Sequence, residues 1–371
     1  HGDVVCGYDN EWRQGLSPWQ LTREGDRWFG RGAADNKGQH TINLAALKCV
    51  LEERGRLGFN IKILIETGEE VGSIGLRELC TANKDRLSAD VFIASDGPRI
   101  APARPTVFMG SRGAFNFNMT VDLREGGHHS GNWGGLLANP GIILAHAIAA
   151  ITSSTGEIKV PQWRPDKIPS SVQDVLGELT IDQDENSPEI DLHWGEPGLT
   201  PPEQVFGWNS FEVLAFETGN PKNPANAIPP KASAHCQVRF VVPTDPEQLL
   251  PALRKFLDEH GLSSVVLSAE GKAARATRLE PDHPWVKWVI ASIETTTGKK
   301  VAVIPNLGGT LPNDVFAEIL GLPTIWVPHS YSGCSQHAAD EHLLGSVSRE
   351  ALQIMTGIWW DLGEIKLPVG H

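Results

Sequence analysis

The stretch that most constrains this chain is 61–75, IKILIETGEEVGSIG. Isoleucines alternate with other residues over 61–65, and this period of two predicts a buried strand. A Thr-Gly break follows, so the adjacent acids Glu69 and Glu70 fall in a loop between a strand and a helix. Open α/β sheets bind ligands at such edges. One carboxylate could bind a metal while the other transfers a proton, although a solvated Glu-Glu pair gives the same pattern.

Composition limits the function classes. A chain of 371 residues exceeds one ordinary core, which predicts two domains. A net charge of -13 and a pI near 5.5 argue against nucleic acid and anionic membrane surfaces as partners, since both need a basic face. No apolar run approaches the ~18 residues of a membrane span. The acidic charge therefore favours a small molecule as the partner. The five cysteines form no CxxC pair and suit a reducing compartment, so we expect a cytoplasmic protein.

The chain begins with HGDVV, in which His1 and Asp3 are two residues apart at what resembles a strand end. At this spacing an acid can hold an imidazole beside a metal, although a short His-x-Asp also occurs by chance. A strand end at His1 requires a strand before it. We therefore expect that an N-terminal segment, at least a helix and one or two strands, is missing from the sequence, which leaves the question of a signal peptide open.

Three further segments end in polar groups. Asp35, in GRGAADNKGQ, opens a predicted helix and could be only its N-cap. Asp96 follows a predicted strand at 90–95. His337 lies in a loop past another strand, and Glu341, four residues on, could buttress it. Several strands would thus deliver acids or a histidine to one edge of a sheet.

The combined set is His1, Asp35, Glu70, Asp96 and His337. Five imidazole and carboxylate ligands suit zinc, manganese or cobalt, and no cysteine is needed. A carboxylate shared by two ions would hold them ~3.5–4 Å apart with a water between them.

The middle of the chain has a different pattern. Strands are expected near 114–121, 211–216, 232–241 and 262–267, with helices near 139–151 and 245–260. The order β-α-β-β-α-β is that of a ferredoxin-like unit. We therefore predict an α/β catalytic domain whose first part is 1–109, an inserted α+β domain at 110–274, and a second catalytic part at 275–371.

Six motifs carry a resemblance that spans essentially the whole chain: HGD, GRGAADNKG, ETGEEVGS, SDG, HHSGNWGG and QHAADEH. Their order and intervals are similar to those of the di-zinc exopeptidase family, which includes carnosine dipeptidases, glutamate-releasing carboxypeptidases, aminoacylases and acetylornithine deacetylases. The resemblance implies a three-layer α/β catalytic domain of the zinc-exopeptidase type, with an inserted ferredoxin-like α+β domain that acts as lid and dimer interface.

The resemblance also implies a ligand arrangement. His1 and Asp96 would bind one metal, Glu70 and His337 the other, and Asp35 would bridge them. Each subunit would hold two divalent ions, with zinc the first choice and manganese or cobalt the alternatives.

Catalytic roles follow from the same motifs. Asp3 would orient His1, and Glu69 would act as general base and acid on the water that bridges the metals. The bond after Asp35 is expected to be cis. The HSG histidine, His129, would reach into the partner subunit's active site and bind the oxyanion of the tetrahedral intermediate, with the preceding histidine as an alternative.

Substrate contacts are expected from both domains. By resemblance to dipeptidases these are Asn226, Arg239, His283, Gly309 and Thr310. Arg239 would bind the terminal carboxylate through its bidentate guanidinium, although an exposed strand arginine is the simpler interpretation.

The expected enzyme is a metallopeptidase or amidohydrolase with a binuclear metal site. It would cleave an amide or peptide bond next to a free carboxylate in a small substrate, as a dipeptidase or carboxypeptidase and as a homodimer. Leu307 departs from the dipeptidase pattern, which tends to have an acid there, so deacylation of N-acetyl or N-succinyl amino acids is the alternative. A non-catalytic binding protein would be expected to lose Glu69 or a ligand. A monomeric enzyme that uses its own lid is a further alternative.

Overall fold

The computed structural model describes residues 1–181 and 188–364, and their contacts divide the chain into two compact units. Unit 1 comprises His1–Ser111, Pro169–Glu189 and Thr277–His371, and unit 2 comprises Arg112–Ile168 and Ile190–Ala276. The sequence placed the inserted domain at 110–274. Residues Pro169–Glu189 differ from that expectation, because they cluster with unit 1.

Unit 1 is built on a four-stranded sheet in the order β12-β5-β13-β3. These strands are β3 (Phe92–Ala94), β5 (Thr106–Phe108), β12 (Ala302–Ile304) and β13 (Thr324–Trp326). A second sheet joins β1 (Thr22–Glu24), β2 (Arg27–Phe29) and β15 (His342–Leu344), and β4 (Pro98–Arg99) pairs with β14 (Ser330–Tyr331).

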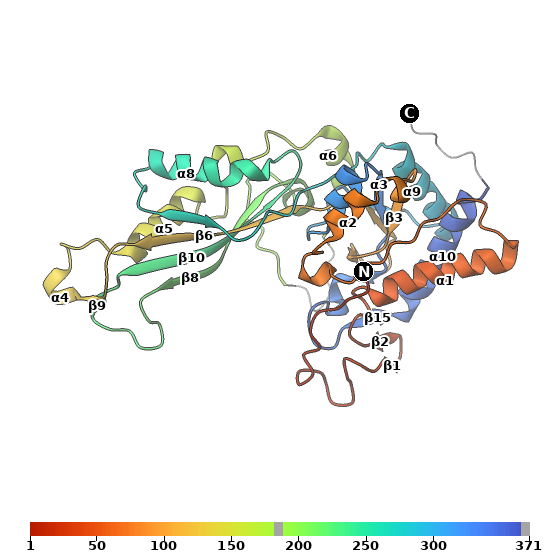
Figure 1. The fold of residues 1–371 in the computed structure, drawn as a ribbon, viewed down its shortest axis with the longest axis horizontal. Helices are drawn as coiled ribbons and strands as arrows, with labels where there is room; N and C mark the ends of the chain where they lie inside the picture. The colour runs from red at the N-terminus through yellow and green to blue at the C-terminus, as the bar shows by residue number, and fades with distance from the viewer. Residues whose placement is uncertain (182–187, 365–371) are drawn as a thin grey trace. The chain divides into compact units, whose positions relative to one another are not determined.

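Helices cover both faces of the main sheet. Its alternate residues point to opposite sides, so Val107 and Ile325 join the core beneath three helices: α1 (Lys37–Arg54), α9 (Pro284–Thr297) and α10 (Gly345–Leu362). Figure 1 shows α1 and α10 side by side. On the other face, Phe108 and Trp326 stack, and the short π-helical turn Val315–Ile319 packs with α2 (Leu76–Ala82). The shorter helices α3 (Lys84–Leu87) and α6 (Ser170–Leu176) complete the unit.

Unit 2 is an antiparallel sheet in the order β11-β6-β10-β8. Its strands are β6 (Gly113–Asp122), β8 (Ser210–Thr218), β10 (Lys231–Phe240) and β11 (Val266–Ala269). The helices α5 (Pro140–Ile151) and α8 (Leu249–Glu259) lie against one face of the sheet (Figure 1). Alternate residues of β6, such as Phe117 and Met119, are buried against them. The predicted β-α-β-β-α-β order is confirmed.

A small ribbon in unit 2 pairs β7 (His128–His129) with β9 (Ala227–Ile228), next to the single-turn helix α4 (Ser130–Trp133). Helix α7 (Pro201–Gly207) is opened by a capping box between Thr200 and Glu203. Among the described residues of both units, no helix combines the length and apolar character that crossing a membrane requires.

The predicted strand at 61–65 is wrong. Residues 61–66 form no strand, and Ile61, Ile63 and Ile65 are 39%, 58% and 51% exposed. The segment lines a groove of about 710 Å³ whose other side includes β3. An alternating pattern reports which face would be buried, not whether a neighbouring strand is present to bury it. The expected N-terminal segment stays a prediction.

Helix α5 allows a matched test of the unit 2 core. Its first turn is fixed by Pro140 and by the Asn139 side chain, which accepts from the backbone of Gly141 and Ile142. Leu144 is fully buried, whereas Ile142 is 60% exposed. We expect Leu144→Ala to lower the free energy of unfolding by about 2–5 kcal/mol, because it leaves a cavity. Ile142→Ala should change it by no more than about 0.5 kcal/mol. Urea unfolding followed by circular dichroism measures both, and equal losses would contradict the assigned core.

Candidate metal centre

The polar groups of the site come from the loops and turns of unit 1. His1 and Asp3 lie on the first residues of the chain, Asp35 lies between β2 and α1, and Asp96 lies two residues past β3. Glu69 and Glu70 open a single 3-10 turn, Glu69–Val71, and His337 follows the 3-10 turn Ser332–Cys334. All of these residues belong to one compact unit.

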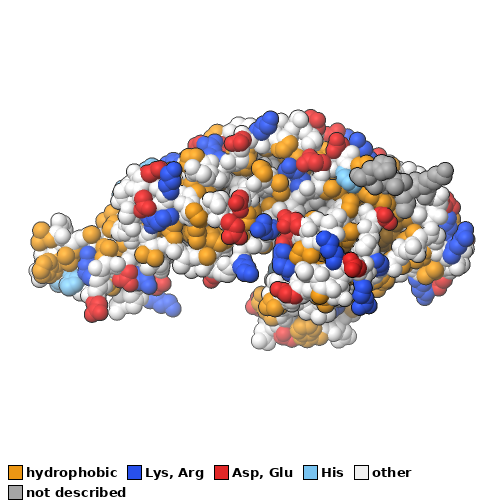
Figure 2. All heavy atoms as spheres, turned by 45° about the horizontal axis from the view of Figure 1, so that its top comes forward, with side chains coloured by type: hydrophobic (Ala, Val, Ile, Leu, Met, Phe, Trp, Pro, Cys, Tyr) orange, Lys and Arg blue, Asp and Glu red, His pale blue; other side chains and the backbone are white. Residues whose placement is uncertain are grey.

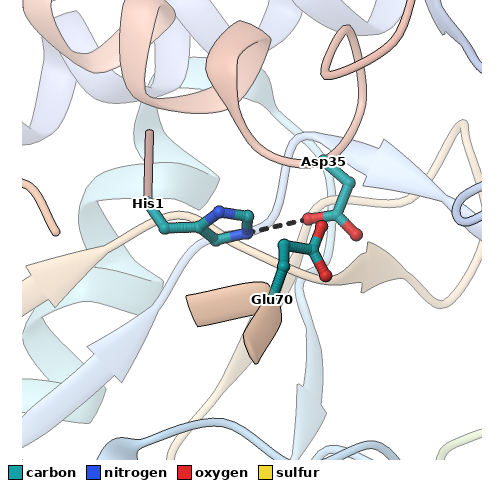
Figure 3. A group of neighbouring side chains, drawn as sticks. All are labelled: His1, Asp35 and Glu70. Carbon is teal, nitrogen blue, oxygen red and sulfur yellow. Dashed lines mark hydrogen bonds and ion pairs between the residues drawn. The ribbon is translucent and has the colours of Figure 1, made fainter. Parts of the chain in front are cut away.

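The centre is organised about the carboxylate of Asp35. Its Oδ1 lies 3.0 Å from Nε2 of His1, and its Oδ2 lies 3.0 Å from Nε2 of His337. His337 Nε2 is also 3.0 Å from Oε2 of Glu70. Figure 3 shows the carboxylates of Asp35 and Glu70 side by side, with the His1 ring directed at Asp35. Ligand atoms of these three drawn residues all lie within 4.8 Å of one another.

The remaining acids lie beside His1. Its Nε2 is 3.6 Å from Oδ2 of Asp96 and 3.7 Å from Oε2 of Glu69. The structure therefore brings the five sequence-predicted ligands into one chain of contacts, with Glu69 next to them. One carboxylate between two imidazoles is the arrangement that a two-ion site requires.

Asp3 holds two parts of the site. Its Oδ1 lies 3.1 Å from Nδ1 of His1, which leaves Nε2 to face Asp35. The same carboxylate accepts from the backbone N–H groups of Glu69 (3.3 Å) and Glu70 (3.1 Å). The sequence predicted the contact of Asp3 with His1 but not its contacts with the backbone of Glu69 and Glu70, because every residue type except proline carries the same backbone N–H group.

The electrostatics of the centre fit divalent cations. Burial, and then the charge of Asp96, raise the pKa of Glu69 to about 8, and burial together with Asp35 raises that of Asp96 to about 7. Burial lowers the pKa of His1, but its hydrogen bond to Asp35 and the nearby carboxylates outweigh that effect and raise it to about 10. Oε1 of Glu70 is buried and has no hydrogen-bond partner among the residues that the structure describes. Crowded carboxylates and an unsatisfied oxygen are what bound cations would compensate.

Two alternatives for Asp35 and Glu341 are settled by contacts. Asp35 is not a helix N-cap, because α1 begins at Lys37 without a side-chain capping bond. The bond between Asp35 and Asn36 is cis, as predicted. The expectation that Glu341 buttresses His337 is wrong. Its carboxylate instead accepts from the backbone N–H groups of Gly32, Ala34 and Asp35. Residues 335–341 form a loop and not a helix, so a spacing of four does not bring the two side chains to one face.

The predicted lid residues lie in unit 2. The backbone N–H of Ser130 donates to the carbonyl of Asn226 (2.9 Å), so His129 and Asn226 are neighbours at the β7–β9 ribbon. Nδ1 of His129 accepts from the backbone of Gly131 (3.0 Å). Arg239 is half-buried on β10, and its Nε donates to Gln237 (2.9 Å). Their substrate roles stay predictions.

The other predicted substrate residues lie in unit 1. Nδ1 of His283 accepts from the backbone of Trp285 (3.2 Å) and caps α9, which gives this histidine a structural role. Gly309 and Thr310 lie in the loop after β12. Leu307, in the same loop, is buried and packs toward Gly97, the residue after Asp96.

Comparison with protein families adds an independent finding. Residues 1–361 match the sequence model described as peptidase family M20/M25/M40. The chain belongs to this peptidase family.

Proteins with sequences similar to this chain include dipeptidases. The cysteinylglycine-S-conjugate dipeptidase of Corynebacterium striatum is 27% identical over 319 residues, which cover 80% of this chain and 65% of that protein. The beta-Ala-His dipeptidase of Homo sapiens is 25% identical over 343 residues, 88% of this chain and 66% of that protein. The chain thus spans about two thirds of the length of these relatives.

A solved structure supports the fold. The M20 family metallo-carboxypeptidase from Sulfolobus solfataricus superposes with a TM-score of 0.81 at 24% identity, over 98% of this chain and 84% of that one. The predicted fold class, a zinc-exopeptidase-type α/β domain with an inserted α+β domain, is confirmed.

The shared position of Asp35 leads to a prediction about metal content. Asp35→Asn removes the negative charge between His1 and His337, so we expect it to lower the binding of both ions, whereas Asp96→Asn should affect mainly one. Zinc bound after dialysis against a limiting concentration, measured by mass spectrometry, tests this difference. An Asp35→Asn variant that keeps the wild-type metal content would contradict the bridging assignment.

Proposed function

We propose that the protein is a metal-dependent hydrolase of dipeptidase type, which cleaves a peptide bond next to the free carboxylate of a small substrate. The observation that carries the proposal is the Asp35 carboxylate, whose two oxygens face the imidazoles of His1 and His337 while Glu69 lies alongside. Family membership and the dipeptidase relatives support it.

The metal ligands are assigned on the contacts of unit 1. His1 and Asp96 would hold one divalent ion, Glu70 and His337 the other, and Asp35 both. The mixed imidazole and carboxylate set favours zinc, with manganese or cobalt as alternatives. Such ions, when bound, supply Lewis-acid polarisation of the scissile carbonyl and lower the pKa of water.

Glu69 is the proton-transfer group of the proposal. Its carboxylate lies beside His1, and its backbone N–H is held by Asp3, so the side chain starts from a fixed position. Burial, and then the charge of Asp96, raise its pKa to about 8 in the metal-free site, and bound cations would lower it toward the range in which the carboxylate is charged. A carboxylate of raised basicity can take a proton from the attacking water and return it to the leaving amine.

Substrate binding is assigned to the remaining predicted residues. Arg239 would bind the terminal carboxylate, because a guanidinium matches that group with two parallel hydrogen bonds. His129 would donate to the developing oxyanion, and Asn226, His283, Gly309 and Thr310 would contact the rest of the substrate. The supporting observation for the unit 2 pair is the ribbon that brings His129 and Asn226 together.

An N-acyl amino acid deacylase is the second candidate. Leu307 favours it, because this apolar side chain lies next to Gly97 and offers no charge to a free substrate amine. Dipeptides compared with N-acetyl and N-succinyl amino acids, on the zinc- or manganese-loaded full-length protein, separate the two. A higher kcat/KM for dipeptides supports the main proposal, and a higher value for acyl amino acids supports deacylation.

We also propose a homodimer that forms through unit 2 in the cytoplasm. Figure 2 shows hydrophobic side chains and a histidine gathered at the end of unit 2 that carries α4, where Trp133 and Leu136 are 45% and 76% exposed. The edge strand β8 also exposes Leu214 and Phe216. The support for a reducing compartment is that all five cysteines, which lie in the described residues, are free.

The role of Glu69 predicts a separation of binding from turnover. Glu69→Gln should keep both metals but lower kcat by orders of magnitude, because the amide cannot accept the proton from water. Glu66→Gln is a matched control, since Glu66 is a half-buried acid of the same segment that bonds to Ser73. Metal analysis and steady-state kinetics measure both. Near-normal turnover of metal-loaded Glu69→Gln would refute the assignment.

The assignment of His129 predicts complementation across a dimer. A mixed dimer of Glu69→Gln and His129→Ala subunits contains one site with an intact Glu69 and an intact His129 from the partner, so mixing the two inactive proteins should restore part of the activity. Subunit exchange is verified with differently tagged subunits. If exchange is complete and activity does not recover, His129 acts within its own subunit.

A further inference from the structure

A buried ion pair contacts the loop that carries Asp35, the central residue of the candidate metal centre. Nη1 of Arg31 is 2.7 Å from Oε2 of Glu341, and both side chains are 0% exposed. The two residues are 310 positions apart in the sequence, and neither is a proposed metal ligand. Burying two charges is costly unless further hydrogen bonds satisfy them, so the contacts of the pair show what it is held against.

Glu341 holds the loop that presents Asp35. Besides Arg31, its carboxylate accepts from the backbone N–H groups of Gly32 (3.0 Å), Ala34 (2.8 Å) and Asp35 itself (2.9 Å). Both carboxylate oxygens are used. The peptide from which the Asp35 side chain projects is therefore fixed by a charged acceptor, which makes stronger hydrogen bonds than a neutral one.

Arg31 ties that loop to two other segments of the site. Its Nη2 donates to the carbonyl of Ala338 (2.8 Å), the residue after His337, and its Nε donates to the carbonyl of Cys6 (3.1 Å), three residues after Asp3. The guanidinium carbon also lies over the rings of Tyr8 and Trp12, 5.5 Å and 5.8 Å from their centroids.

We propose that Arg31 and Glu341 form a positioning pair for the metal centre. The pair fixes the relative positions of the segments that carry His1, Asp35 and His337, so that the Asp35 carboxylate stays between the two imidazoles. The inference rests on the proposed metal-dependent function. Groups that orient ligands without touching the metal typically change metal affinity about 10–100-fold when they are replaced.

The chain offers a matched control in the same unit. Glu350 on α10 is also paired with a buried arginine, Arg99, and with Lys299, and it contacts none of the proposed ligands among the described residues. In Glu341→Gln the new amide N–H group would face backbone N–H donors, and the acceptor loses its charge. Glu350→Gln breaks a comparable ion pair away from the centre.

The test compares zinc affinity with stability in the full-length protein. Competition with a chromophoric chelator gives the zinc dissociation constant, and thermal unfolding of the metal-free protein gives Tm. We expect Glu341→Gln to weaken zinc binding about 10–100-fold and Glu350→Gln to change it by less than about 2-fold, while both lower Tm. If Glu341→Gln keeps wild-type zinc affinity, or if both variants lose affinity equally, the positioning role is refuted.

A second variant keeps the test available if Glu341→Gln does not fold. Arg31→Lys retains the charge but lacks the planar fork that bonds Glu341, Ala338 and Cys6 together, so it should also weaken zinc binding about 10-fold. Unchanged affinity in Arg31→Lys would refute the pair. Failure of the metal centre itself is distinguishable, because wild-type protein would then bind no zinc or Asp35→Asn would bind it normally.

Discussion

The structure of the site depends on one constraint, the sharing of the Asp35 carboxylate by two imidazoles. The Asp35 carboxylate between His1 and His337 shares a small volume of unit 1 with four further carboxylates, those of Asp3, Glu69, Glu70 and Asp96. Burial removes water from these carboxylates and their charges also repel one another, and both effects raise the pKa values of Glu69 and Asp96. Bound divalent cations would compensate such crowding while the side chains keep their positions.

The position of Asp96 among the proposed ligands was predictable because it follows a rule of topology. The strands of an α/β sheet deliver the residues that follow them to one edge, and Asp96 after β3 is an example. The six motifs added specificity, since each contains an acid or a histidine and five of them contain glycines that permit sharp turns. Gly32, with φ 80°, is such a turn, whereas His337 adopts a positive φ of 58° without being a glycine. The fold of unit 2 followed from alternation in its strands and from the first turn of α5 at Asn139-Pro140.

Other features were not predictable from the same patterns. The isoleucines at 61–65 have the period of a strand, but the structure leaves this segment unpaired along the groove beside β3. Local periodicity cannot say which neighbour is present. The segment Pro169–Glu189 was assigned to the inserted domain because it lies inside it in sequence, whereas its packing is with unit 1. Glu341 was assigned to His337 by a spacing of four, which matters only in a helix, and these residues are in a loop.

The misassignment of Glu341 points to how precision is achieved in this site. The proposed ligands lie on loops, and loops are normally less rigid than helices or strands. The proposed two-ion centre would tolerate little variation in the distances between its ligands, so the loops have to be held by something other than regular secondary structure. Asp3 holds the turn at Glu69 and Glu70, and Glu341 with Arg31 holds the turn at Asp35. In both cases a carboxylate that contacts no proposed metal accepts from backbone N–H groups that no helix or strand uses, and the buried charge is thereby satisfied at the point where rigidity is needed.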